Sequence, residues 1–531
     1  MSEFISPGAL KEMLLDNDEL ALIDVREGAV FGRAHLLHAC SLPLSRLELH
    51  IADLVPRRSV RVVVCDGGEG LAERAAKRLR YFGYSDVRLL EGGIKTWADA
   101  GYEVFSGVNV PSKAFGEFIE HEYSTPSISA EELKAKLDVG EDLVILDSRP
   151  MDEYRVMNIP GAVCVPGAEL VYRARDIAPS SDTLVVVNCA GRTRSIIGAQ
   201  SLINASIPNR VVALRNGTMG WHLSGYELEH GMERKAPEVS AKGLASARAA
   251  AAQVGHRFGV TTIDRTTLGR WIEEREQRSL HLLDVRSPGE YEAGHLPASI
   301  SAPGGQLVQA TDRYVGTLRS RIVLIDDTGV RATMTASWLK QMGWMEVVVL
   351  ENALETEGLE EGARRAPVLG VDEVDVDEIS PQALMQLSAG GVNVVDLSDS
   401  SSYRLRHIPQ AWFALRSRLS DALTKLPSAA LLILTSEDGV LAHFAAAEVA
   451  ALTSTPVKVL AGGNAAWAAD GLPLAEGFEN MASEADDVWL RPYDRESGAE
   501  DAMQDYLSWE VDLVHQIERD GTTGFRGANT L

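Results

Sequence analysis

The stretch LVVVNCAGRTRS, residues 184–195, is an apolar run that stops at a cysteine and continues into a loop with two arginines. The run is typical of a strand buried on both faces. The segment IIGAQSLI, which follows at once, has the spacing of an amphipathic helix. Strand, loop and helix in this order predict an α/β sheet, where ligands bind at the carboxyl ends of the strands. Cys189 stands at such an end.

Working outward, the same unit occurs four times in the chain. Each copy begins with an apolar strand that ends in Asp-x-Arg or a relative of it, at Asp24, Asp147, Asp284 and Asp396. A second apolar strand follows, in the order RVVVC, LVVVNC, RIVLID and LLILTS. A helical pattern and a third strand come next. Three copies then carry a glycine turn with tryptophan, whereas the third copy reads LENALE.

Apolar runs that alternate with helical patterns predict parallel sheets covered by helices on both faces. A repeat this long indicates tandem domains and not a solenoid. We expect α/β domains at residues 1–108, 127–232, 260–360 and 376–475, followed by a tail at 476–531 with a helix at 502–517. The expected role of that helix is to pack on a neighbouring domain.

Local signals place several helix starts. Ser6-Pro7 and Ser380-Pro381 each put serine at the N-cap and proline at the first helical position. Ser129 and Glu132 fit a capping box. The segments PSKAFGEFIEHEY and AKGLASARAAAAQV predict helices between the first three domains.

Composition restricts the classes of function. The chain has 531 residues, too many for one core, with 45% apolar and 24% charged residues. The net charge of −25 argues against nucleic acid as a partner, because its phosphates need a basic face. An anion site must therefore be a local exception, made by arginines and backbone N–H groups.

Four cysteines exclude a disulfide scaffold. No apolar window reaches the length of a membrane span, and MSEFISPGALKEML lacks the features of a secretory signal. We expect a cytoplasmic protein with no membrane partner. No His/Cys cluster has ligand spacing, so we expect neither metal nor cofactor.

The loop at Cys189 has the chemistry of an anion site. AGRTRS can turn successive N–H groups inward, and the following helix adds its positive end. This arrangement predicts a lowered thiol pKa. Arg192 and Arg194 supply fixed charge for an oxyanion, and Ser195 is the expected N-cap. On composition alone, a buried core cysteine is the alternative.

The four units resemble rhodanese domains. In the second copy the Asp-x-Arg strand end, the cysteine loop and the Gly-x-x-x-Trp turn occur in register, and CAGRTRS resembles the rhodanese persulfide loop. The resemblance implies that the Cys189 thiolate takes the sulfane sulfur of thiosulfate, releases sulfite and becomes a persulfide. A thiophilic acceptor such as cyanide, a small thiol or a protein would then remove the sulfur, as in covalent catalysis with two half-reactions.

The resemblance also implies the site residues. Cys189 is the nucleophile, Arg192 and Arg194 bind the anionic donor, and Arg149 is a further substrate contact, while Asp147 is structural. The rest of the predicted donor site is the loop itself, at Ala190, Gly191, Thr193 and Ser195.

The other copies depart from this pattern. Cys65 is placed at the position of Cys189, but its loop carries Asp66 and Glu69 and no arginine. The third copy has Asp326 or Asp327 at that position, and the fourth has Thr435 or Ser436. A carboxylate cannot carry sulfane sulfur, and a hydroxyl without a base is no substitute. We expect these copies to be inactive and to pack on the active unit, present acceptors or form an oligomer interface.

Two smaller predictions concern residues outside the loop. His295 and His407 are expected to be structural, since the second copy has Met157-Asn158 in their place. Cys40 and Cys164 are expected to be core residues, with Cys164 also a candidate to protect or resolve Cys189.

Three other functions stay open. Cysteine phosphatases and arsenate reductases share the architecture but use Cys-x5-Arg, which would place arginine at position 195, where this chain has Ser195. A persulfide-carrying or redox scaffold is favoured by the degenerate copies. A donor such as 3-mercaptopyruvate is favoured by loops of small neutral residues, whereas arginines favour thiosulfate.

Overall fold

Each of the four repeats forms one five-stranded parallel sheet. The structure is a computed structural model that describes residues 3–387 and 391–527. The strand order is β1-β5-β4-β2-β3 in the first sheet and equivalent in the other three. The strands are β1 Phe4–Ile5, β2 Leu20–Asp24, β3 Cys40–Ser41, β4 Arg61–Cys65 and β5 Asp86–Leu90; β6 Ser127–Ile128, β7 Leu143–Asp147, β8 Val163–Cys164, β9 Leu184–Asn188 and β10 Val211–Leu214; β11 Thr261–Ile263, β12 Leu280–Asp284, β13 Ile300–Ser301, β14 Arg321–Ile325 and β15 Val347–Leu350; β16 Glu378–Ile379, β17 Val392–Asp396, β18 Trp412–Phe413, β19 Leu431–Thr435 and β20 Val457–Leu460.

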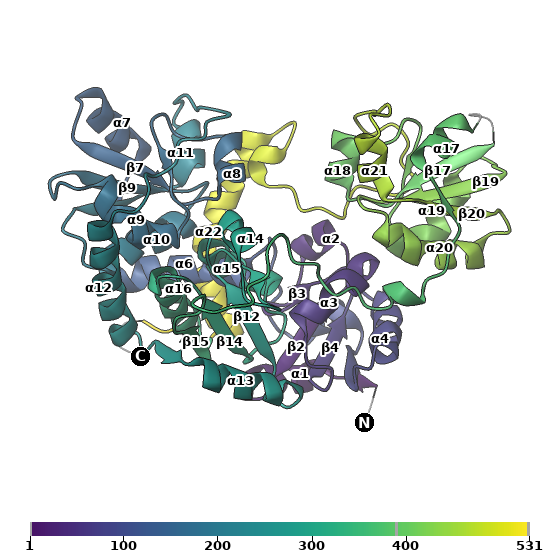
Figure 1. Cartoon of the computed structure of the whole chain (residues 1–531), viewed down its shortest axis with the longest axis horizontal. Helices are drawn as coiled ribbons and strands as arrows, with labels where there is room; N and C mark the ends of the chain where they lie inside the picture. Colours follow the sequence, from purple (N-terminus) through teal and green to yellow (C-terminus); the bar gives the residue numbers. More distant parts are fainter. Residues whose placement is uncertain (1–2, 388–390, 528–531) are drawn as a thin grey trace.

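Helices cover both faces of every sheet, which confirms the predicted fold class (Figure 1). Within the domains they are α1 Pro7–Leu15, α2 Gly28–Arg33, α3 Leu47–Leu54, α4 Leu71–Tyr81 and α5 Gly93–Asp99; α7 Ala130–Asp138, α8 Met151–Val156, α9 Glu169–Ile177, α10 Thr193–Asn204 and α11 Gly217–Leu223; α13 Arg265–Glu273, α14 Pro288–Ala293, α15 Gly304–Gln309 and α16 Val330–Gln341; α17 Pro381–Gln386, α18 Ser400–Leu405, α19 Leu419–Lys425, α20 Val440–Leu452 and α21 Gly463–Ala469. Between and after the domains lie α6 Val110–Tyr123, α12 Ala241–Arg257 and α22 Ala499–Asp520.

The third domain departs from the others after its last strand. A short turn follows β15 where the other domains have α5, α11 or α21. This is the copy whose sequence, LENALE, lacks the glycine and the tryptophan.

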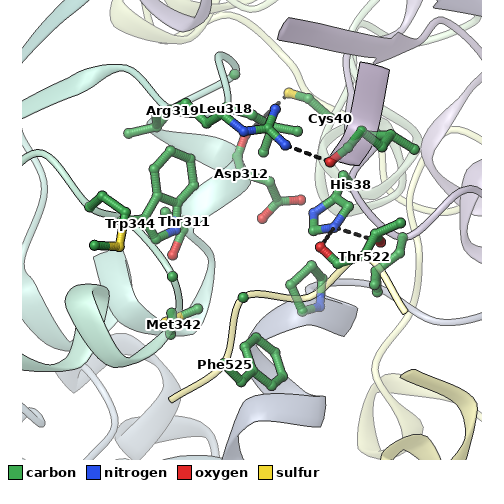
Figure 2. A pocket seen from close by; sticks show the side chains of 18 of the residues that line it. His38, Cys40, Thr311, Asp312, Leu318, Arg319, Met342, Trp344, Thr522 and Phe525 are labelled. Atoms are coloured by element: carbon green, nitrogen blue, oxygen red, sulfur yellow. Dashed lines mark hydrogen bonds between the residues drawn. The ribbon is translucent and has the colours of Figure 1, made fainter. Parts of the chain in front are cut away.

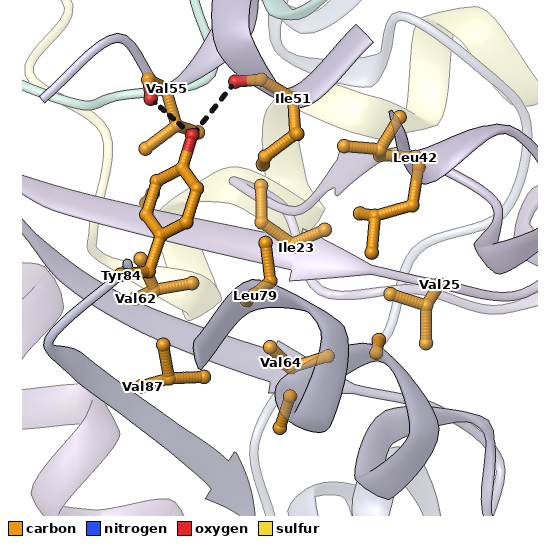
Figure 3. Packing of buried hydrophobic residues seen from close by; sticks show 14 of the residues in the cluster. Ile23, Val25, Leu42, Ile51, Val55, Val62, Val64, Leu79, Tyr84 and Val87 are labelled. Atoms are coloured by element: carbon orange, nitrogen blue, oxygen red, sulfur yellow. Dashed lines mark hydrogen bonds between the residues drawn. The ribbon is translucent and has the colours of Figure 1, made fainter. Parts of the chain in front are cut away.

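The cores form where strand residues meet helix residues on each face. In the first domain, one face packs Val62 and Val64 of β4 against Leu79 of α4 (Figure 3). Tyr84 lies in the same cluster, and its hydroxyl donates to the carbonyl of Val55 at 2.8 Å, so its one polar group is satisfied. Burying each such side chain contributes about 1.5–3 kcal/mol.

The predicted helix starts are confirmed with one exception. Ser6 accepts a hydrogen bond from the Ala9 N–H, Ser380 accepts from the Ala383 N–H, and Ser129 with Glu132 forms both bonds of a capping box. The N-cap of α10 is Arg192, so the prediction of Ser195 as N-cap was wrong. The helix starts earlier, and the Ser195 hydroxyl donates back to the Arg192 carbonyl at 2.7 Å.

The tail ties the domains together. From the fourth domain the chain crosses to the second, where α22 packs along α6 (Figure 1). The fourth domain contacts the first through Arg416, whose guanidinium binds Glu48 at 2.8 and 3.0 Å. No helix in the described ranges is long and apolar enough to cross a membrane.

Candidate active site

Cys189 follows β9 directly and precedes α10, as the sequence predicts. Only 2% of its surface is exposed. It opens onto a cavity of about 750 Å³ that is lined by residues of all four domains and of the tail. From the predicted set, the loop residues that line the cavity are Ala190, Gly191, Arg192, Thr193 and Arg194.

Strand register shows which residues are equivalent to Cys189. Asp147 pairs with Asn188, and Asp24 pairs with Cys65. Cys65 therefore matches Asn188, and the residue at the Cys189 position of the first domain is Asp66. The placement of Cys65 at that position was wrong, because the strand reaches one residue further than the sequence comparison assumed.

The same register identifies the other two equivalents. Asp284 pairs with Ile325 and Asp396 with Thr435, so the next residues, Asp326 and Ser436, take the Cys189 position. Backbone bonds into the turn after the last strand agree: the carbonyls of Cys189, Asp66 and Ser436 each accept an N–H at 2.8–3.0 Å. Cysteine therefore occurs at this position only in the second domain.

The three replacement side chains bond within their own loops. Asp66 accepts from the Ala72 N–H at 3.0 Å, Asp326 from the Ala332 N–H at 3.2 Å and Ser436 from the Ala442 N–H at 3.3 Å. The equivalent neighbour of Cys189 is Ser195, whose hydroxyl lies 3.5 Å from the sulfur. Oxygen atoms thus close the helix start in three copies, where the second copy presents sulfur.

The loop after Cys189 keeps its backbone donors. In the part of the chain that the structure describes, the N–H groups of residues 190–194 donate to no protein acceptor. Because such groups stabilise negative charge at a helix start, the loop suits an anionic ligand.

Arg194 lines the cavity but is already paired. Its guanidinium binds Glu153 through two bonds of 2.9 and 2.7 Å and contacts the Gln306 side-chain oxygen at 3.2 Å. Burial alone would raise the pKa of Glu153, but Arg194 lowers it to about 2. The pair is therefore fully ionised at neutral pH, and little of the Arg194 charge is left for a substrate.

Arg192 lines the cavity, but its guanidinium is bound to α6. It forms two bonds of 2.7 Å with Glu117 and also binds Glu120. Its charge is neutralised across the interface between α10 and α6. The sequence placed both arginines in one donor site, but the glutamates that bind Arg192 come from the linker helix α6, and the glutamate that binds Arg194 comes from α8.

Arg149 is fully buried and does not line the cavity. It binds Asp147 at 2.9 and 2.7 Å and the Met157 carbonyl at 2.7 Å. The same pair recurs as Arg26–Asp24 and Arg286–Asp284, in domains that lack the cysteine. The structure therefore places Arg149 in a repeated structural element and not against the cavity.

The pKa of the Cys189 thiol is shifted in the direction opposite to the prediction. Burial raises its pKa, and Glu510 raises it further, while Arg194 and the Ser195 hydrogen bond oppose the rise. The prediction of a lowered pKa was wrong, because the loop arginines are held by glutamates and the tail covers the loop.

Three side chains at the Cys189 loop or its cavity were missed by sequence reasoning. The Glu510 carboxylate accepts from the Thr193 hydroxyl at 2.7 Å, and Tyr506 lies one helical turn earlier on α22. A methyl group added to Gly191 would meet Glu510 and Tyr506 at 3.3 Å, so α22 lies directly on the loop. Lys113 of α6 lines the same cavity. Their only sequence signal is helical spacing, which indicates packing and not a site.

The remaining cysteines are free and buried. Burial raises the pKa of Cys164 to about 12, and its sulfur donates to the Arg149 carbonyl at 3.4 Å. Cys40 lies at a second cavity of about 430 Å³, where its sulfur donates to the Asp312 carbonyl at 3.1 Å (Figure 2). Both are core residues, as predicted, and the resolving role of Cys164 stays a prediction.

The structural reading of the histidines is confirmed. His295 and His407 stack on Tyr291 and Tyr403 with ring centroids 3.8 and 3.9 Å apart, and each bonds the carbonyl of that tyrosine. In the second domain Asn158 makes the equivalent bond to a tyrosine carbonyl at 3.2 Å. Loss of the histidine therefore leaves this contact in place.

Comparison with known proteins agrees with this architecture. The sequence pattern of the rhodanese-like domain matches residues 6–100, 129–224 and 267–356. The chain belongs to the rhodanese family. The fourth rhodanese-like domain is recognised by its structure, since its strand order is that of the other three.

Solved structures and curated proteins similar to this rhodanese indicate its class of activity. A thiosulfate sulfurtransferase from Pseudomonas aeruginosa is 50% identical, with a TM-score of 0.96 and 99% of each chain covered. A putative sulfur carrier protein of Bacillus subtilis is 26% identical over 191 residues, which are 34% of this chain and 90% of that protein. A sulfurtransferase of Allochromatium vinosum is 28% identical over 100 residues, 19% of this chain and 92% of that protein. This rhodanese is an enzyme of the sulfurtransferase class.

Proposed function

We propose that this rhodanese moves sulfane sulfur from thiosulfate to a thiophilic acceptor through a persulfide on Cys189. The observation that carries the proposal is the loop comparison: of four equivalent positions, only the second holds sulfur, and that sulfur opens onto the 750 Å³ cavity. The high similarity to a thiosulfate sulfurtransferase supports thiosulfate as the donor.

The first half-reaction is a displacement at sulfur. The Cys189 thiolate attacks the outer sulfur of thiosulfate, and a new S–S bond forms. The S–S bond of thiosulfate breaks, and its electron pair leaves on sulfite. The negative charge on the new persulfide meets the free N–H groups of residues 190–194 and the start of α10.

The second half-reaction returns the free enzyme. An acceptor thiolate or cyanide attacks the terminal sulfur, the persulfide bond breaks, and the electron pair returns to Cys189. The enzyme is modified between two substrates, so ping-pong kinetics are expected. The acceptor, whether cyanide, a small thiol or a protein, enters through the same cavity.

Phosphatase or arsenate reductase chemistry fits less well. Position 195 holds a serine whose hydroxyl bonds inside α10, and Arg194 is bound to Glu153. Neither group is free to hold a tetrahedral oxyanion from the side. A sulfur-carrying scaffold uses the same persulfide, and 3-mercaptopyruvate is the alternative donor.

Intact mass after incubation with thiosulfate tests the proposal. We expect the wild type to gain one sulfur atom and Cys189→Ser to gain none, while Cys65→Ser behaves like the wild type because its sulfur belongs to the core. An adduct lost only in Cys65→Ser would move the site to the first domain. No adduct in the wild type would reject thiosulfate as donor, and 3-mercaptopyruvate would be tried next.

A further inference from the structure

The arginines at the Cys189 cavity are either paired with carboxylates or exposed. Thiosulfate carries two negative charges, yet Arg192 and Arg194, the arginines of the loop, are each bound to glutamate. Two further arginines of the lining are also paired, Arg491 with Asp494 and Arg404 with Glu496. Arg313 lines the cavity as well but is exposed, where a cation holds an anion weakly.

Lys113 differs from all of these. It lies on α6, is 4% exposed and lines the cavity. Its ammonium lies 4.8 Å from the ring centroids of both Tyr506 and Trp509. In the described ranges it forms no direct ion pair: two aromatic faces contact its ammonium, and the Glu510 carboxylate acts on it electrostatically from beyond ion-pair distance.

A buried ammonium of this kind is costly unless an anion joins it. Taking a charge out of water is unfavourable without a partner, and cation–π contacts offset only part of the cost. The Lys113 site is therefore prepared for an anion that enters the cavity. Lys113 and Cys189 share one neighbour, because the Glu510 carboxylate acts electrostatically on both.

We propose that Lys113 is the residue that binds the anionic sulfur donor beside Cys189, and so sets the preference for a charged donor. This inference rests on the proposed sulfur transfer. The residue comes from the linker helix between two domains and is held in place by α22, so the donor site is completed from outside the catalytic domain.

Donor binding by Lys113 is expected to depend on pH. Burial lowers the pKa of Lys113 to about 8, with Glu510 and Asp312 opposing the shift and Arg194 and Arg313 adding to it. As pH rises through about 8, Lys113 loses its proton and donor binding weakens. The Cys189 thiolate becomes more abundant over the same range, since its pKa is raised by burial. Loading by thiosulfate is therefore expected to pass through a maximum.

Alkylation by two reagents of similar size but different charge tests the site without requiring sulfur transfer. Iodoacetate and iodoacetamide both alkylate a thiolate, with loss of iodide, but only the first is an anion. The ratio of their rates at Cys189 is measured for the wild type, Lys113→Met, Lys113→Arg and the exposed control Lys95→Met, with Cys189→Ser to identify the modified thiol. We expect Lys113→Met to lower the iodoacetate-to-iodoacetamide ratio about tenfold, the size of one lost charged contact.

Steady-state kinetics complete the test. We expect Lys113→Met to raise KM for thiosulfate about tenfold, whereas Lys113→Arg restores it and shifts the alkaline limb to higher pH. Lys95→Met should match the wild type in both assays. An unchanged ratio and KM in Lys113→Met would overturn the proposal. Failure of the wild type to take up sulfur would reject the proposed function, while the alkylation ratio would still report on Lys113.

Discussion

At the scale of single residues, the four copies differ most at one position. Cys189, Asp66, Asp326 and Ser436 all follow the second long strand of their domain. Oxygen there accepts N–H groups from the helix that follows, which stabilises the loop but leaves no nucleophile. Sulfur is a poor acceptor, so the second copy lacks those bonds and has a thiol at this position.

Replacement of Arg149 by methionine separates a structural from a substrate role. Asp147 would stay buried without its partner, at a cost of about 3–5 kcal/mol. We expect Arg149→Met to melt at lower temperature with KM for thiosulfate unchanged. Arg26→Met, at the same pair in the first domain, should lose stability without touching catalysis. A raised KM at normal melting temperature would restore Arg149 as a substrate contact.

At the scale of elements, α6 and α22 bring residues from outside the second domain to the Cys189 cavity. α6 supplies Lys113 to the cavity and two glutamates to Arg192, and α22 supplies Glu510 to the Thr193 hydroxyl. The apolar face of α22 packs Leu507 on Met157 and Met219 of the second domain. The tail helix was predicted to pack on a neighbouring domain, and the surface it covers is the loop after Cys189.

Loosening α22 is expected to uncover Cys189. Leu507→Ala removes a buried side chain from this contact at a cost of about 2–5 kcal/mol. We expect faster alkylation of Cys189 by iodoacetamide and faster hydrogen exchange over 499–520. Val511→Ala, on the same helix but 48% exposed, is the matched control and should change stability by about 0.5 kcal/mol or less. Equal alkylation rates in both variants would show that α22 does not limit access.

At the scale of the whole molecule, the three domains without a cysteine at the loop position contribute to the walls of the cavity. Gly28 of the first domain, Gln306 of the third and Arg404 of the fourth all line it together with the Cys189 loop. The fourth domain is fixed to the first by Arg416, which is 3% exposed and binds both Glu48 and Glu448. The degenerate copies were expected to pack on the second unit, and in the structure they help to enclose its cavity.

Breaking this contact should open the molecule. Arg416→Met leaves Glu48 and Glu448 with Arg78 as their remaining ion-pair partner among the described residues, and the loss of the Arg416 bonds costs about 1.5–3 kcal/mol. We expect a larger radius of gyration in solution scattering and faster proteolysis between residues 361 and 377. Arg80→Met, at an exposed ion pair with Glu3, is the control and should cost about 1 kcal/mol or less. An unchanged radius in Arg416→Met would mean that other contacts hold the domain.

The amino-acid sequence alone predicts the four α/β units, the helix caps at Ser6, Ser129 and Ser380, and the place of Cys189 in the loop after a buried strand. These follow from short-range patterns, namely strand and helix periodicity and residues within one loop. The sequence did not predict the register of Cys65, because the end of a strand is set by pairing with the neighbouring strand and not by its own residues.

Which charges at the Cys189 cavity are paired depends on the tertiary structure. Arg192 and Arg194 look free in the loop, but Glu117 and Glu153 neutralise them, and both glutamates lie far from the loop in the chain. Lys113 and Glu510 come from segments whose sequence pattern predicts only helices that pack on a domain. Ion pairs and burial depend on distances in space, and no spacing along the chain encodes those across four domains.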